Sequence, residues 1–454
     1  MLKSLFKKKG PKALIIGLDG VPYSMLKDYI AKGELPNLKQ ILEQGFDLNR
    51  MDASIPDVSS TSWTSFMTGV NPGEHGIYGF MDLRPNSYNM YFPNSENINA
   101  PAFWDILGKS VDGRTSTFKN RYEGKIDRPY RSIVINIPQT YPAKPLNGIL
   151  TAGFVALDLK KATYPDSAFD YLNSIGYVID VDAQKARDQK DSFIKELFDV
   201  LDKRGEAIRH FMTEEPWDLF IATITETDRL HHFFFDAAMD EDHQYHESFR
   251  TFYNRLDSLI GELYDMFLDM TGGEGFFMTM SDHGFVPLEK EVYINNYLKE
   301  QGLLKTDEGR DFFDKIDYGT KVFAMEPARI YINMEGKYPR GFVKESERGT
   351  VIKEIKEALM SFKDEDSNHP VKEVHERDGL YSGPMFDVAP DLICLPNDGY
   401  DLKATLQKQG LFGKEHFTGM HTQYDAHCIL AGQTELSKKL HIEDLSGIIL
   451  DYFC

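Results

Sequence analysis

Residues 13–20 read ALIIGLDG, a short apolar run that ends in an acidic residue and a glycine. The β-branched side chains in its middle predict a buried strand, which places Asp19 at the carboxyl end of that strand. Similar runs occur at residues 133–137 (IVINI), 218–227 (DLFIATITET) and 276–280 (FFMTM). Helical stretches separate these runs, among them residues 22–45 in two pieces. The alternation predicts an α/β fold with a mostly parallel central sheet and helices on both faces.

Aspartates follow three of the predicted strands, at Asp19, Asp228 and Asp282. One aspartate after a strand is usually a helix cap or a turn residue. Here, however, two of the three have histidines nearby. Because ligands of parallel sheets bind outside the carboxyl ends of the strands, the three acids predict a functional site at this edge.

Two histidine pairings point to metal binding. Asp228 and His232 are four residues apart, so on a helix both side chains face one ion, although the same spacing is common in plain surface contacts. Asp282 and His283 are adjacent, and a tight turn that Gly284 permits can direct both at one ion. A turn with a capping aspartate stays the alternative there. His231 faces another side of the helix, in the core or behind the ligands.

A loop rich in hydroxyl groups lies in residues 54–69 (SIPDVSSTSWTSFMTG), and a helix is predicted from about Ser62. A hydroxyl beside a divalent cation loses its proton readily and becomes a nucleophile. The helix N-terminus favours a phosphate group, and one of the hydroxyls is expected to be a helix cap. Oxygen and nitrogen ligands without thiolate suit zinc or manganese. Residue types and spacing alone therefore predict a metal-dependent hydrolase and nothing narrower.

Composition excludes some partners and compartments. A formal net charge of −20 over 454 residues argues against a nucleic-acid-binding surface. Three distant cysteines without a C-x-x-C motif predict a reducing, cytoplasmic environment. No run approaches 18 apolar residues, so no membrane span is expected. Residues 1–12 form a basic arm, expected to be frayed and capable only of weak contact with an anionic membrane.

The domain organisation is predicted from where the pattern changes. Residues 13–290 and 400–454 are assigned to the catalytic domain, with a late strand at 427–432 and a closing helix at 437–452. Residues 291–399 show a looser pattern, with a strand at 329–333 (RIYIN) and charged connectors. We expect this segment to be an insertion or cap beside the main sheet.

Five strings in the chain resemble the alkaline phosphatase superfamily, and within it the type I phosphodiesterase/nucleotide pyrophosphatase branch. They are LIIGLDG, SIPDVSSTSWTSFMTGVNPGEHGIYGF, ETDRLHHFFF, MSDHGF and TGMHTQYDAHCILAG. INIPQTYPAKPLNG and ARIYIN look like the predicted cytosolic phosphohydrolase/phosphomutase members, so the resemblance covers nearly the whole chain. It implies an alkaline phosphatase-like fold, a small phosphate-ester substrate, and two divalent metal ions that hold the phosphate, with zinc favoured and manganese possible.

The resemblance also implies roles for individual residues. One ion would be held by Asp19, Asp282, His283 and the nucleophile, and the other by Asp228, His232 and His421. The motif P-x-x-[ST] places the nucleophile on Ser59, which would form a covalent phosphoserine. The implied activity is that of a phosphodiesterase. The alternatives are a phosphomonoesterase, a phosphomutase or phosphotransferase with the same intermediate, and a catalytically silent sensor that binds metals or phospho-ligands.

The chain departs from the family pattern at Phe80, where nucleotide pyrophosphatases have an asparagine that steadies the transferred phosphoryl group. Asn136 is a candidate substitute, and Ser60 is a second candidate for substrate binding. Neither the arginine-plus-metal arrangement of true alkaline phosphatases nor the C-x-P-x-R signature of sulfatases is found in the sequence. Among the remaining histidines, His75 is expected in a turn, and His416 and His427 flank His421 without following a T-G-x motif.

Overall fold

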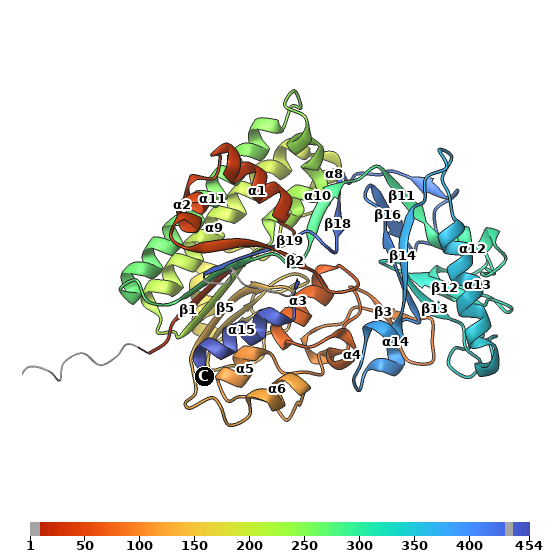
Figure 1. Cartoon of the computed structure of the whole chain (residues 1–454), viewed down its shortest axis with the longest axis horizontal. Coiled ribbons are helices and arrows are strands. Elements are labelled where there is room, and N and C mark those ends of the chain that lie inside the picture. Colours follow the sequence, from red (N-terminus) through yellow and green to blue (C-terminus); the bar gives the residue numbers. More distant parts are fainter. Residues whose placement is uncertain (1–9, 432–438) are drawn as a thin grey trace, which may run out of the picture.

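The computed structural model describes residues 10–431 and 439–454, so most of the predicted basic arm lies outside the described residues. Its centre is a nine-stranded sheet (Figure 1). β1 runs parallel to β8 and β9, and β5 runs parallel to β8 and β6, whereas β19 is antiparallel to its neighbours. The predicted fold class is confirmed. In spatial order the strands are β20 (Leu440–His441), β2 (Phe46–Asp52), β19 (Ala426–Ala431), β9 (Phe276–Met280), β1 (Ala13–Leu18), β8 (Leu219–Ile224), β5 (Ser132–Ile137), β6 (Gly148–Ala152) and β7 (Thr163–Tyr164).

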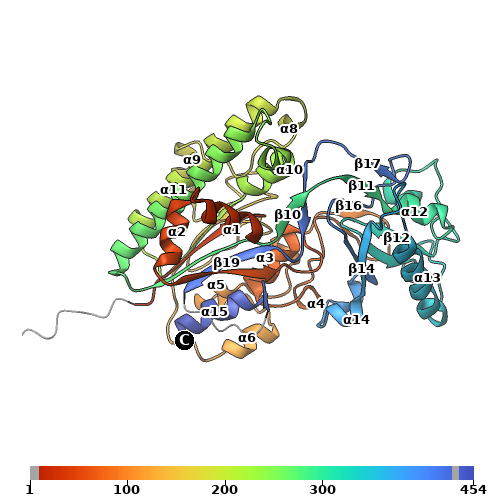
Figure 2. The same ribbon diagram turned by 45° about the horizontal axis from the view of Figure 1, so that its top comes forward.

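Helices cover both faces of this sheet (Figures 1 and 2). One face is covered by α1 (Tyr23–Lys32), α2 (Pro36–Glu43), α9 (Lys190–Glu214), α10 (Glu226–Met239) and α11 (His246–Thr271). The other is covered by α3 (Ser59–Thr68), α5 (Phe103–Leu107), α6 (Thr117–Tyr122) and α15 (Asp444–Phe453). Shorter helices are α4 (Pro72–His75), α7 (Asp166–Ser174) and α8 (Lys185–Asp188). None of the described helices combines the length and apolar character needed to cross a bilayer.

Two helix starts differ from the prediction. α3 begins at Ser59 instead of Ser62, and all ten of its residues are buried. Its hydroxyl groups are tolerated inside the helix because Thr64 and Thr68 donate hydrogen bonds to the carbonyls four residues earlier. The closing helix α15 begins at Asp444, because residues 440–441 pair with β2 as β20. The first two residues predicted for it, 437 and 438, lie outside the described part of the chain.

A second hydrophobic core lies beside the main sheet, formed mostly by residues 292–404. It contains the antiparallel sheet β12 (Val322–Met325), β13 (Arg329–Ile332), β15 (Leu392–Pro396) and β14 (Val371–Glu376), with α12 (Ile294–Glu300), α13 (Arg348–Ser361) and α14 (Arg377–Leu380). A small sheet combines β16 (Tyr400–Lys403), β11 (Lys290–Tyr293) and β17 (Phe412–Gly413), and β3 (Asp82–Leu83) pairs with β4 (Met90–Tyr91). We call this part the cap. β11 and β16 begin at residues 290 and 400, where the predicted insertion starts and ends, and the two strands pair with each other. The exact boundaries of the insertion stay a prediction.

The central strands end at one edge of the sheet. Leu18 is paired with Ile224, and Gly17 with Met280, so β1, β8 and β9 terminate side by side. Their residues are almost all buried, as expected for strands covered on both faces. β10 (Gly284–Pro287) leaves this edge and pairs antiparallel with β18 (Gly419–Thr422). This strand pair brings residues 419–422 to the carboxyl edge of the central sheet.

Candidate active site

Two buried aspartates mark the carboxyl edge of β1 and β9. Asp19 follows β1 and accepts a hydrogen bond from the indole Nε1 of Trp63 at 3.0 Å. Asp282 follows β9 and accepts a hydrogen bond from the backbone N–H of Gly20 at 3.0 Å. Gly20 has φ = +66°, and a Cβ atom there would lie 2.5 Å from the ring of Phe285. Glycine therefore allows the turn that brings the two carboxylates together.

Ser59 is the first residue of α3 and directs its hydroxyl at these acids. Its Oγ lies 3.2 Å from His283 Nε2 and 3.5 Å from Asp19 Oδ1. The helix is preceded by Val58, and no side chain caps it, so the expected hydroxyl cap is wrong. Within the described chain, the backbone N–H groups of Ser59 and Ser60 have no hydrogen-bond acceptor. Free N–H groups at a helix N-terminus favour an anion.

The predicted pair on α10 meets a histidine from β18. His232 Nε2 lies 3.4 Å from Asp228 Oδ1, and His421 Nε2 lies 3.3 Å from the same oxygen. The two histidine Nε2 atoms are 3.0 Å apart. His421 is opposite Phe285 in the β10–β18 pair, and its ring stacks on that of His283 with centroids 3.7 Å apart. All seven residues predicted as ligands or nucleophile are thus in one place.

The hydrogen-bond pattern of the histidines fits a cation. His283 Nδ1 faces the carbonyl of Gly284 at 3.1 Å, and His421 Nδ1 faces the carbonyl of Asp57 at 3.0 Å. Each Nδ1 must donate its hydrogen there, which leaves the Nε2 lone pair for a metal ion. Asp228 Oδ1 and Asp282 Oδ2 are buried without a hydrogen-bond partner. Converging lone pairs and unpaired carboxylate oxygens are the donor set that a divalent ion would satisfy.

Two groups of side chains have ligand atoms close enough to share an ion. One group is Asp19, Asp282 and His283, and the other is Asp228, His283 and His421, with the atoms of each group within 4.8 Å of one another. His283 belongs to both groups. The two candidate positions are therefore adjacent.

The pKa values of the buried acids and of His283 also indicate that the site needs more positive charge, which a bound cation would supply. Burial raises the pKa of Asp282 to about 7, and burial together with the charges of Asp282 and Asp228 raises the pKa of Asp19 well above its ordinary value. Burial and the neighbouring His421 lower the pKa of His283. Burial also raises the pKa of Asp228, but His232, His421 and Arg229 outweigh it and hold that pKa below its ordinary value.

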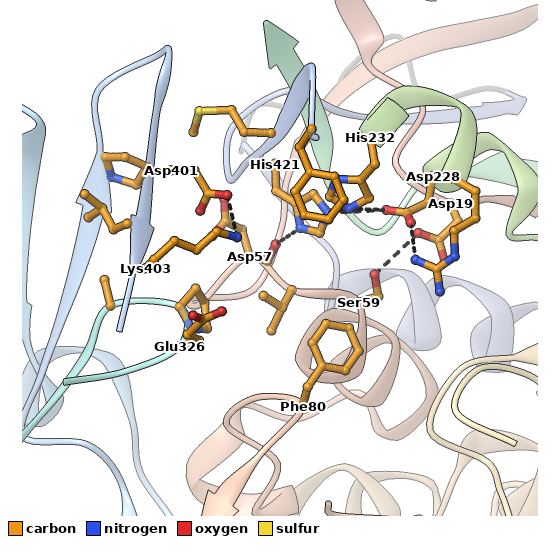
Figure 3. A pocket seen from close by; sticks show the side chains of 18 of the residues that line it. Asp19, Asp57, Ser59, Phe80, Asp228, His232, Glu326, Asp401, Lys403 and His421 are labelled. Carbon is orange, nitrogen blue, oxygen red and sulfur yellow. Dashed lines mark hydrogen bonds and ion pairs between the residues drawn. The ribbon is translucent and has the colours of Figure 1, made fainter. Parts of the chain in front are cut away.

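A cavity of about 300 Å³ opens beside these residues (Figure 3). Asp19, Ser59, Asp228, His232 and His421 line one end of it, as Figure 3 shows. The other end belongs to the cap and contributes the charged side chains of Asp401, Lys403 and Glu326. Apolar side chains also line the cavity, among them Phe80, Phe154, Phe233 and Phe417.

Both candidate substrate-binding residues lie outside the lining of this cavity. Asn136 is fully buried at the end of β5, where its amide donates to Thr225 Oγ1 at 3.0 Å and accepts from the hydroxyl of Tyr177 at 3.5 Å. Because its amide is used inside the core, Asn136 does not replace the missing asparagine. The side chain of Ser60 is also fully buried and is not among the residues that line the cavity.

The other histidines have structural partners or face solvent. His75 contacts Ser65 Oγ at 3.0 Å through Nε2 and accepts from the N–H of Ile77 through Nδ1. His231 lies behind the site, with the carbonyl of Gly20 on one side and the hydroxyl of Tyr253 on the other. His427 is buried in β19, and His416 is exposed.

Arg229 lines the same cavity but was not singled out from the sequence. Its position directly after Asp228 in ETDRLHHFFF was the available signal. Two of its contacts, Asp180 and Phe154, come from distant parts of the chain and are not readable from local sequence.

The fold and the side chains gathered at this edge of the sheet define an α/β domain with a candidate metal-binding active site. The profile of the type I phosphodiesterase/nucleotide pyrophosphatase family matches residues 13–425, and the chain belongs to that family. The protein is therefore an enzyme that hydrolyses phosphoric esters. No curated protein matches the chain by sequence.

Solved structures share the fold across the whole chain. Phosphonoacetate hydrolase from Sinorhizobium meliloti 1021, in complex with phosphonoacetate, has a TM-score of 0.63 at 17% identity, covering 98% of this chain and 97% of that one. Murine ectonucleotide pyrophosphatase/phosphodiesterase 5 has a TM-score of 0.52 at 14% identity, with coverages of 97% and 95%. The human form of the latter gives 0.52 at 15% identity, with coverages of 97% and 94%. At these identities the likeness shows the fold alone.

Proposed function

We propose that this protein is a two-metal phosphodiesterase that acts through a covalent phosphoserine on Ser59. The observation that carries the proposal is the place of the Ser59 hydroxyl. It lies 3.2 Å from Nε2 of His283, the residue common to both groups of candidate ligands, and Ser59 lines the cavity. A nucleophile at the junction of two ion positions suits in-line displacement at phosphorus.

The proposed ligands divide as the family resemblance implies. Asp19, Asp282, His283 and Ser59 would hold one ion, and Asp228, His232 and His421 would hold the other. Zinc is favoured and manganese is the alternative, because all the side-chain donors are oxygen or nitrogen. When bound, the ions stabilise negative charge on the attacking and leaving oxygens.

The protein's own groups account for the remaining steps. Asp19 and His283 orient the Ser59 hydroxyl, which loses its proton to solvent as its oxygen attacks phosphorus. The bond from phosphorus to the leaving oxygen breaks, and that oxygen takes up a proton from water to leave as the alcohol. The backbone N–H groups of Ser59 and Ser60 are free to bind a phosphoryl oxygen during this step. Water then attacks the phosphoserine, which releases the phosphate product and restores the serine hydroxyl.

The cavity favours a diester over a monoester. Phe80 and Phe154 are among the apolar side chains that line it, and its volume of about 300 Å³ offers room for a second ester group. The cap end has two carboxylates, Asp401 and Glu326, against the single ammonium of Lys403. A diester has one negative charge near neutral pH whereas a monoester has almost two, so the acidic end disfavours the monoester more strongly.

We also propose a cytoplasmic location and a small phosphate ester as substrate. Cys394 and Cys428 are buried and unpaired, and Cys454 is exposed and unpaired. Free thiols of this kind suit a reducing compartment.

The test compares bis(p-nitrophenyl) phosphate with p-nitrophenyl phosphate on the purified, metal-reconstituted protein, with Ser59→Ala as control. The expected result is faster hydrolysis of the diester, lost in the variant. Preference for the monoester would replace the proposal by a monoesterase. Transfer of the phosphoryl group to an added alcohol would indicate a phosphotransferase. No turnover of either ester, with two metal ions bound, would favour the silent sensor and contradict the proposal.

A further inference from the structure

Arg229 is a cation at the catalytic end of the cavity. It follows Asp228 on α10, lines the cavity, and its side chain is 15% exposed. Its Nη1 donates to Asp228 Oδ2 at 3.0 Å. On the other side, Nε and Nη2 donate to the two carboxylate oxygens of Asp180, at 3.2 and 2.7 Å. Arg229 therefore bridges a proposed metal ligand and a second carboxylate.

Counting its donors shows that Arg229 has N–H groups to spare. A guanidinium has five N–H groups, of which the contacts to Asp228 and Asp180 use three. One N–H on Nη1 and one on Nη2 have no acceptor within the described chain. The guanidinium is planar and always charged, and its remaining N–H groups can donate to oxygens of a phosphate.

The position of the guanidinium is fixed by contacts from distant segments. Phe154 lies against its face, with the ring centroid 4.5 Å from Cζ, and Phe80 packs edge-on against Phe154 at 5.3 Å. The segment with Asp180 is held in turn by Arg204, which donates to the carbonyl of Ile179. Arg204 also forms a fully buried ion pair with Glu226 at the start of α10, at 2.6 Å. A donor held on three sides loses little entropy when it binds a ligand.

We propose that Arg229 binds the non-bridging oxygens of the transferred phosphoryl group, in place of the asparagine that is absent at position 80. Phe80 has a different task in this arrangement, because it supports Phe154 and thereby the guanidinium. The inference rests on the proposed phosphoryl-transfer site and adds to it a fixed positive charge. That charge is present at every pH at which the enzyme is folded, since guanidinium does not lose its proton.

A purely structural role for Arg229 makes a different prediction. If Arg229 only held Asp228 in place, its removal would release a metal ion, and phosphate binding would be lost as a consequence. If Arg229 binds the phosphoryl group, metal content is retained while phosphate affinity falls. Measuring both quantities separates the two roles.

The experiment uses the metal-reconstituted full chain with Arg229→Ala, Arg229→Gln and Arg229→Lys. Arg128→Ala is the matched control, because Arg128 also pairs with one aspartate (Asp218) through two nitrogens and lies over an aromatic ring (Tyr130) at 4.1 Å, outside the cavity lining. The readouts are metal content by elemental analysis, the Kd of inorganic phosphate by calorimetry, and kcat/KM on bis(p-nitrophenyl) phosphate. Added guanidinium chloride at tens of millimolar tests for rescue of Arg229→Ala.

The expected result is two metal ions in every variant, at least tenfold weaker phosphate binding in Arg229→Ala, and kcat/KM lower by about 100-fold. Guanidinium should restore part of the activity of Arg229→Ala and have no such effect on Arg128→Ala. Unchanged phosphate affinity in Arg229→Ala and Arg229→Gln would overturn the inference, as would loss of a metal ion in these variants. Phosphate binding also separates this inference from the proposed function, because it is measurable even if the diester is not hydrolysed.

Discussion

Removal of the His421 imidazole should cost the enzyme one metal ion and leave the other. His421 Nε2 belongs with Asp228 and His283 and is absent from the group of Asp19, Asp282 and His283. Loss of a hydrogen-bonded partner behind a ligand weakens metal binding by about 10- to 100-fold. Loss of the ligand itself should exceed this, so the expected change for the second ion is at least about 100-fold, or about 2.7 kcal/mol.

The design has to separate lost ligation from lost packing. The His421 ring stacks on His283 and contacts Phe285 with centroids 4.9 Å apart, so alanine leaves a gap in the site. His421→Asn fills part of that gap and should show the same metal loss. His416→Ala is the matched control, because His416 is an exposed histidine in the same segment.

The assay is zinc content by elemental analysis after dialysis against buffered free zinc, at a concentration that saturates the wild type. Two ions per chain are expected in the wild type and in His416→Ala, and one in both His421 variants. Equal loss of both ions would refute the partition of ligands, and retention of both would remove His421 from the ligand set.

Two further outcomes are expected. Ser59→Thr should retain turnover because either hydroxyl can attack. Ser59→Ala should lose turnover by roughly 10⁴-fold or more while both metal ions stay bound, as release of p-nitrophenolate and elemental analysis would show. Equal activity in Ser59→Ala would exclude this nucleophile. Burial lowers the pKa of His75 to about 3, so the folded state binds fewer protons than the unfolded state, and stability should fall as the pH drops from about 6.5 towards 3. At pH 5 the free energy of unfolding should be lower by about 2 kcal/mol because of His75. His75→Asn keeps an acceptor for the N–H of Ile77 but cannot become charged, so its urea midpoint should fall less between pH 7 and pH 5 than that of the wild type. An unchanged pH dependence in this variant would contradict the assignment.

Local sequence was sufficient for the fold class and for much of the site. Short β-branched runs predict buried strands because burial on both faces requires a continuous apolar sequence. Asp19 and Asp282 could be placed because the carboxyl ends of parallel strands share one edge of the sheet. The pairing of Asp228 with His232 followed from the period of the helix.

Where side chains point inside the fold could not be predicted in the same way. Asn136 was a reasonable donor by position, but its amide is taken up by Thr225 and Tyr177. The four neighbouring hydroxyls at the start of α3 look alike in sequence, yet only that of Ser59 lines the cavity. Which hydroxyl faces the cavity depends on where the helix starts, and packing of the fully buried α3 decides that.

By itself the sequence determined the strands, the acids at their ends and the family motifs, because these depend on neighbours within a turn or a strand. The tertiary structure alone decided what surrounds them. His421 reaches His283 through the β10–β18 pair, and Arg229 meets Asp180, 49 residues earlier, and Phe154 in the cavity. Such contacts join segments whose distance in sequence contains no information about their distance in space, so only the packed fold fixes them.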